Sequence, residues 1–224
     1  MPNQTIKTYE QARHAIEQWG ILPLSSFIPD HPSLDTITAP DAWHTGSDTD
    51  PWLWRDRFAS EGVAAYGRFM SGKPLLVSRD IFPLVRCVLS PSETVEERYG
   101  AGTLARETLR IYELIEEHDG IDVKALRKMA GMQDKADKNA FDHALIDLQS
   151  TADIVISGIS GRLNEQGNKS GWNSTCYILA SRWMEEHQLE ALLLTPTDAR
   201  TTLFAWLEPR WEASALAYLR KKIG

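Results

Sequence analysis

The stretch from residue 104 to residue 180 constrains the possible fold more than any other part of the chain. It contains three segments whose apolar residues recur at helical spacing, with one extended residue, Ile121, between the first and the second. Asp122 stands where its carboxylate can cap the second helix. The apolar stripes are Leu104, Leu109, Tyr112, Leu114 and Ile115 in the first segment, Val123, Leu126 and Met129 in the second, and Phe141, Ala144, Leu145 and Leu148 in the third.

Two short strands are predicted directly after these helices. Residues 153–159 and 174–180 have the β-branched and aromatic character of strands, and Gly, Asn, Gln and Lys in the segment between them indicate a turn. Three helices followed by a two-stranded ribbon is the order of a winged helix. We therefore predict an α+β fold with a winged-helix domain over residues 101–185; the alternative is that the same elements pack as another kind of α+β domain. The expected core of this domain is Leu109, Leu126, Phe141, Leu145, Leu148 and Ile156.

The sequence on either side predicts two further regions. Residues 1–100 form an N-terminal α+β region with a proline-rich irregular loop, and residues 186–224 form a C-terminal helical extension. The elements expected outside the winged helix are helices over residues 8–20, 52–60, 197–206 and 211–223, strands over residues 62–69 and 74–78 with a turn at residues 71–73, and a helical or extended run over residues 80–89.

The cysteines, the apolar segments and the net charge exclude several classes of protein. The two cysteines, Cys87 and Cys176, lie far apart and outside any metal-ligand spacing, so we expect no disulfide, no structural zinc and no cofactor. No segment reaches the ~20 apolar residues that cross a bilayer, and the first ten residues are polar, so we expect a cytoplasmic protein without a membrane partner. The net charge of -7 argues against a general polyanion binder.

A winged helix that binds DNA places its third helix in the major groove and its wing against phosphates. The nucleic-acid-binding candidates are Lys135, Lys138 and Asn139 at the third helix and Arg162 and Lys169 in the wing. Acidic neighbours oppose the two lysines of the helix more than the two cations of the wing. Two interpretations are open: weak, salt-sensitive DNA binding, and a winged helix that contacts another protein.

Aromatic and basic side chains gather in the N-terminal region. Trp52, Trp54, Arg55, Tyr66 and Arg68 offer planar faces and positive charge, which suit a pocket for a base or another planar ligand. Such a pocket is also compatible with a small-molecule enzyme. The alternative is that the aromatic rings are core and that the arginines cover apolar surface with their stems.

The proline-rich loop carries residue types that are found at metal sites. Its spacing matches no ligand pattern, and Asp is common in turns because it forms local hydrogen bonds, so we expect a solvated loop without a metal. The residues concerned are Asp30, His31, Asp35, Asp41, His44, Asp48 and Asp50. The sequence signatures of the commonest hydrolases, nucleotide-binding proteins and metalloproteases are also absent.

Four short segments resemble bacterial proteins described as AlkZ-related, and the resemblance spans most of residues 50–185. These segments are residues 51–56 (PWLWRD), 66–69 (YGRF), 78–83 (SRDIFP) and 171–174 (GWNS). AlkZ-type enzymes are DNA glycosylases built from tandem winged helices that excise damaged bases with a Gln-x-Gln or Gln-x-Asp motif. The resemblance thus implies a winged-helix fold and a link to base excision. Neither Gln133-Asp134 nor Gln149 with Thr151 has the spacing or residues of that motif.

Overall fold

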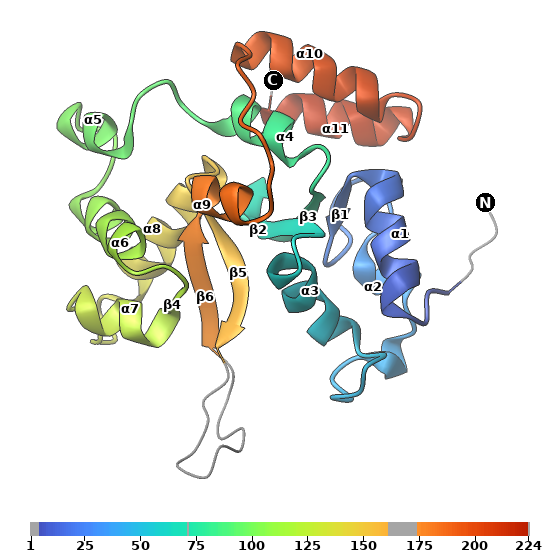
Figure 1. Ribbon diagram of the computed structural model, residues 1–224, viewed down its shortest axis with the longest axis horizontal. Helices are drawn as coiled ribbons and strands as arrows, with labels where there is room; N and C mark the ends of the chain where they lie inside the picture. Colours follow the sequence, from blue (N-terminus) through green and yellow to red (C-terminus); the bar gives the residue numbers. More distant parts are fainter. Residues whose placement is uncertain (1–4, 71, 161–173, 224) are drawn as a thin grey trace.

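The computed structural model describes residues 5–70, 72–160 and 174–223. Within these residues, helices surround a six-stranded sheet in which neighbouring strands are antiparallel, in the order β1-β3-β2-β5-β6-β4 (Figure 1). The predicted α+β class is confirmed. The strands are β1 (Ile21–Pro23), β2 (Ala64–Met70), β3 (Lys73–Ser78), β4 (Ile121–Asp122), β5 (Ile154–Ser160) and β6 (Ser174–Leu179).

The N-terminal elements begin and end where local chemistry predicts. Thr8 caps α1 (Tyr9–Trp19) by accepting a hydrogen bond from the backbone N–H of Gln11, and the helix ends at Gly20, whose φ of 73° suits glycine. Asp50 caps α3 (Pro51–Ser60). The loop predicted to be irregular includes β1, a short helix α2 (Leu34–Ile37) and a 3-10 turn η1 (Pro40–Ala42), and α4 (Phe82–Leu89) follows β3.

Residues 106–179, which we call the helix–ribbon module, contain α6 (Arg106–Glu117), β4, α7 (Val123–Met129), α8 (Lys138–Ser150), β5 and β6. This order agrees with the order predicted from the sequence. β4 pairs with β6, with Ile121 opposite Tyr177, and the carboxylate of Asp122 accepts hydrogen bonds from the backbone N–H groups of Lys124 and Ala125.

The expected core of the module is correct except at its first helix. Leu126, Phe141, Leu145, Leu148 and Ile156 are buried, whereas Leu109 is only half-buried. The predicted stripe was correct at Leu114 and Ile115, which are buried, whereas Leu109 and Tyr112 pack against the core while half-buried and Leu104 precedes α6. Its buried residues are Thr108, Ile111, Leu114 and Ile115.

The sheet is continuous across the N-terminal region and the module, because β2 pairs with β5 through Tyr66 and Ile156. Each face of the sheet has its own hydrophobic core. Helices α1, α3, α6, α7 and α8 cover the face that carries these two residues. The other face packs against α4, α9 (Ala180–Glu186), α10 (Pro196–Leu207) and α11 (Ala213–Ile223). The domain boundaries at residues 100 and 185 stay a prediction.

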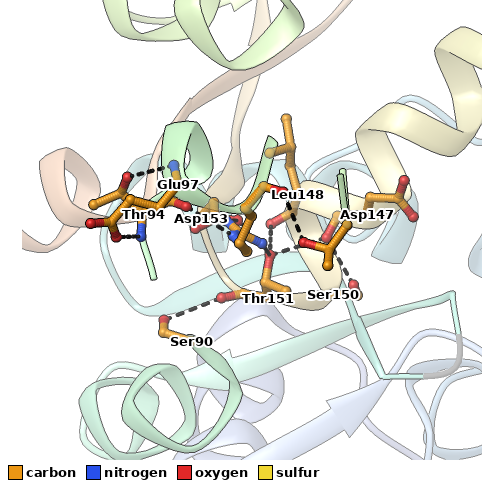
Figure 2. A network of polar contacts seen from close by, with 10 residues as sticks. Ser90, Thr94, Glu97, Asp147, Leu148, Ser150, Thr151 and Asp153 are labelled. Carbon is orange, nitrogen blue, oxygen red and sulfur yellow. Dashed lines mark hydrogen bonds and ion pairs between the residues drawn. The ribbon is translucent and has the colours of Figure 1, made fainter. Parts of the chain in front are cut away.

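Besides α2, two short helices were not predicted from the sequence. The first, α5 (Val95–Gly100), is tied to the start of β5 by an ion pair between Arg98 Nη2 and Asp153 Oδ2 at 2.6 Å. Figure 2 shows Asp153 with Thr151, whose backbone carbonyl accepts a hydrogen bond from Ser90 at 3.2 Å. The second, α9, begins at Ala180, where we expected β6 to continue. Among the described residues, no helix is both long enough and apolar enough to cross a bilayer.

Candidate functional site

A cleft of about 580 Å³ lies between α3 and the part of β5 that extends beyond β2, and we call it the α3 cleft. Hydroxyl groups, carboxylates and one arginine share its walls with apolar side chains. This mixture suits a ligand that combines hydrogen bonds with apolar contacts. The lining residues are Ser47, Asp48, Leu53, Trp54, Asp56, Arg57, Ser60, Gly120, Ser157, Gly158, Ile159 and Cys176.

A bulge in β5 shapes one wall of this cleft. Ile156 pairs with Tyr177 and Gly158 pairs with the adjacent Cys176, so Ser157 is an extra residue on the bulged strand. Gly158 has a φ of 136°, which other residues rarely adopt. A Cβ atom at Gly158 would lie 3.6 Å from the backbone oxygen of Asp56, so the bulge brings the ribbon directly against α3.

Asp56 is the buried carboxylate of the cleft. The residue is 6% exposed, and the nearest charged partner is its neighbour Arg55, with 3.4 Å between Arg55 Nε and Asp56 Oδ2. Burial raises the pKa of Asp56 above its ordinary value, and the positive charge of Arg55 offsets part of that shift. A carboxylate with a raised pKa at the wall of a cleft is suited to accept a proton from a bound molecule.

Three of the five pocket residues predicted from the sequence come together. The guanidinium carbon of Arg55 lies 3.3 Å from the ring centroid of Trp52 and 6.0 Å from that of Tyr66. Trp52 is 38% exposed and Tyr66 is buried, and burial raises the pKa of Tyr66. Arg55 is therefore held flat against an indole that faces solvent.

The other two predicted pocket residues have different surroundings. Trp54 is 2% exposed and donates a hydrogen bond from Nε1 to the backbone oxygen of Asp48 at 2.7 Å, with part of its surface on the α3 cleft. Arg68 is exposed and donates from Nη1 to the backbone oxygen of Gly72 at 2.9 Å. Trp54 is thus a core residue that also forms part of the cleft wall. Arg68 instead bonds to the turn that follows its own strand, β2.

The nucleic-acid-binding candidates at α8 lie on the surface. Lys135, Lys138 and Asn139 are exposed at or just before the start of this helix. Lys138 Nζ lies 2.6 Å from Asp142 Oδ2 on the next turn, so an adjacent carboxylate neutralises this cation. The two wing candidates, Arg162 and Lys169, lie outside the described residues.

Several aspartates and histidines of the proline-rich loop have structural partners. The carboxylate of Asp50 accepts hydrogen bonds from the backbone N–H groups of His44, Gly46 and Trp52. His31 is buried, and its Nε2 lies 2.8 Å from the backbone oxygen of Ile21. In the part of the chain that the structure describes, no three His, Cys, Asp or Glu side chains are grouped as metal ligands.

His31 predicts a pH dependence of stability. Burial lowers its pKa from 6.5 to about 4, so the unfolded chain takes up a proton on this imidazole at a higher pH than the folded protein does. The free energy of unfolding should therefore fall by up to about 3 kcal/mol as the pH decreases from 6.5 to 4. Urea denaturation of His31→Gln over the same pH range should lack this component, and an identical pH dependence in the two proteins would contradict the prediction.

Comparison with known proteins adds one finding to this geometry. A family model described as AlkZ related matches residues 6–224. The chain belongs to the AlkZ-related family. Searches of the curated proteins and of the solved structures found no match.

In this AlkZ-related chain, the glutamines nearest to the expected excision motif lie outside the α3 cleft. Gln149 is 1% exposed; its Nε2 donates to the backbone oxygen of Leu145 at 2.7 Å and its Oε1 accepts from the backbone N–H of Arg68 at 3.1 Å. The Oε1 end of this amide thus joins α8 to β2, while its Nε2 end is bonded within α8. Gln133 is exposed in the loop before α8.

Sequence reasoning missed the polar residues that shape the cleft of this AlkZ-related protein. Asp56 was overlooked because the buried residues of α3 do not form a single stripe: Trp54, Asp56 and Phe58 alternate with Arg55 and Arg57. The usable signal was a carboxylate between two tryptophans and a phenylalanine. Gly158 lies within the strand predicted over residues 153–159, and an isolated glycine within a strand often marks a bulge, so its position was the usable signal there.

Proposed function

We propose that the protein associates with duplex DNA and accepts a single base from that duplex into the α3 cleft. We further propose that the helix–ribbon module is a winged helix in which α8 approaches the major groove; its order of three helices and a two-stranded ribbon supports this. Membership of the AlkZ-related family supports a link to base excision. Enzymes that act on a base in a duplex must first extrude it, and the cleft volume of about 580 Å³ is in the range of pockets for small ligands.

The main support for this proposal is that residues of the β5–β6 ribbon form part of the wall of the α3 cleft. Gly158 and Cys176 belong to both the ribbon and the cleft wall. The predicted wing, which carries Arg162 and Lys169, follows β5 directly in the sequence. A duplex held through Arg162 and Lys169 would therefore have its bases near the opening of the cleft.

A second function, contact with another protein, is favoured by a groove of about 570 Å³ on the outer side of the module. Half-buried Leu109 and exposed Tyr99 supply apolar surface in this groove, and both positive and negative side chains line it. The pairing of Lys138 with Asp142 also reduces the positive charge that α8 offers to phosphate.

The salt dependence of DNA affinity tests the proposal. Affinity for a fluorescent duplex, measured by anisotropy, should fall with salt with a log-log slope near -0.9 for each neutralised phosphate, and few phosphates should be involved. Replacing Arg162 and Lys169 together with alanine should make the slope shallower by about 2. The matched control is Lys221→Ala with Lys222→Ala, which removes the same charge from α11 and should leave the slope unchanged.

Two results would contradict this account of DNA association. The first is no binding even at low salt, and the second is a slope that Arg162→Ala with Lys169→Ala leaves unchanged. Either result would favour the protein-contact function of the module.

A further inference from the structure

The following inference rests on the proposed function and concerns the chemistry of the α3 cleft. Hydrolysis of the bond between a base and its sugar needs a group that accepts a proton from the attacking water. Gln149 is held at both ends by backbone groups, so its amide serves the packing of α8 on β2. The group must therefore be sought among the residues that line the cleft.

The cleft contains two carboxylates in different environments. Asp48 is exposed, whereas the side chain of Asp56 is 8% exposed and lies beside Arg55. A carboxylate partly removed from water is a stronger base than an exposed one, because its charged form is less well solvated. The positive charge of Arg55 offsets part of the free-energy cost of burying the negative charge of Asp56. Trp52 holds Arg55 in place through the stacking described above.

We propose that Asp56 is the catalytic base of the α3 cleft. Asp56 lies on the same face of α3 as Arg57 and Ser60, which also line the cleft, and this face is opposite the bulge of β5. The bulged residue Ser157 and the backbone around Gly158 form the opposite wall, where polar groups can hold the edge of the base.

The reaction consumes one water molecule and needs no other reactant. The oxygen of the water forms a bond with the sugar carbon C1′ as the bond from C1′ to the base nitrogen breaks, and the electron pair of the broken bond leaves with the base. Asp56 takes one proton from the water. In the methylated duplex the alkylated base carries a positive charge, so it leaves as a neutral base with the electron pair, and the proton on Asp56 passes to solvent. The products are an abasic sugar with a hydroxyl group, the neutral base and one proton.

Single-turnover base release from a labelled duplex methylated with dimethyl sulfate tests this role. Excess protein is incubated with the duplex, and abasic sites are revealed by alkaline cleavage. Asp56→Asn should lower the rate constant of release by roughly 100- to 10,000-fold, while its duplex affinity and its unfolding midpoint stay close to those of the native protein. The matched control is Asp41→Asn, which removes an exposed carboxylate of η1 outside the cleft and should release bases at the native rate.

The pH profile separates catalysis from a structural effect. The rate for the native protein should fall at acid pH as Asp56 takes up a proton, at a pH above the ordinary 3.8 because burial raises the pKa of this carboxyl. Asp56→Asn should lack this acid limb, and Asp41→Asn should retain it. A native profile without an acid limb would overturn the role of Asp56 even if the variant proved difficult to fold.

The remaining outcomes distinguish this inference from the proposed function. Release by Asp56→Asn at the native rate, or a loss confined to Asp48→Asn, would overturn the inference. Duplex binding without base release from the methylated DNA would also overturn it and leave DNA association standing. Absence of duplex binding would refute the proposed function itself.

Discussion

Replacing Trp183 with alanine should lower the free energy of unfolding by about 3 to 5 kcal/mol. The indole is fully buried in α9, meets the ring of Phe82 edge-on with 5.4 Å between centroids, and donates a hydrogen bond from Nε1 to the backbone oxygen of Ala59 at 2.8 Å. The substitution therefore leaves a large cavity and removes the hydrogen bond from Nε1, although the backbone N–H of Gly62 still donates to the Ala59 carbonyl at 3.3 Å. Urea denaturation followed by circular dichroism measures the loss.

Trp52→Ala is the matched control for this prediction. Trp52 is 38% exposed, so its removal creates no closed cavity, and the loss should be about 1 kcal/mol or less. Equal losses in the two variants would mean that α9 does not pack against α3 as described.

Replacing Asp153 with alanine should cost about 3 to 5 kcal/mol, because it leaves Arg98 buried without its carboxylate. The side chains of Arg98 and Asp153 are 10% and 16% exposed, and the hydroxyl of Thr151 also contacts Asp153 (Figure 2). Loss of the pair should release α5 from the start of β5. Urea denaturation with hydrogen exchange of residues 94–103 measures both effects.

Two further variants make this prediction specific to a buried charge. Arg98→Met combined with Asp153→Leu removes both charges and should recover most of the stability that Asp153→Ala loses. Glu113→Ala breaks the ion pair with Arg110, in which the side chains of Arg110 and Glu113 are 50% and 48% exposed. This substitution should lower the free energy of unfolding by less than about 1 kcal/mol. No recovery in the double variant would show that packing, and not unpaired charge, dominates at this position.

Local periodicity and capping chemistry predicted most of the helix–ribbon module. The stripe of α8 and the cap at Asp122 depend on residues only a few positions apart, so they can be recognised in the sequence. The single extended residue at Ile121 was a correct indication of β4, although its pairing with Tyr177 depends on a partner 56 positions away. Leu109 was misplaced because apolar residues occur on more than one side of α6.

The cleft could not be predicted in the same way, because its walls come from distant parts of the chain. Asp56 and Gly158 become neighbours only after β2 pairs with β5 through Tyr66 and Ile156. A single sequence contains no periodic signal for such a pairing. The aromatic and basic residues around Trp52 were noticed for their types, but the arrangement of Arg55 over the ring of Trp52 depends on the packing of α3 against the sheet.

Hydrogen–deuterium exchange with and without a saturating DNA duplex tests the central claim most directly. If the module binds the duplex, exchange should slow in residues 133–143 and 161–173 and in the adjoining ends of β5 and β6, with no change in α10 and α11. Protection confined to α10 and α11, or no protection in the module at a duplex concentration that saturates binding, would contradict it.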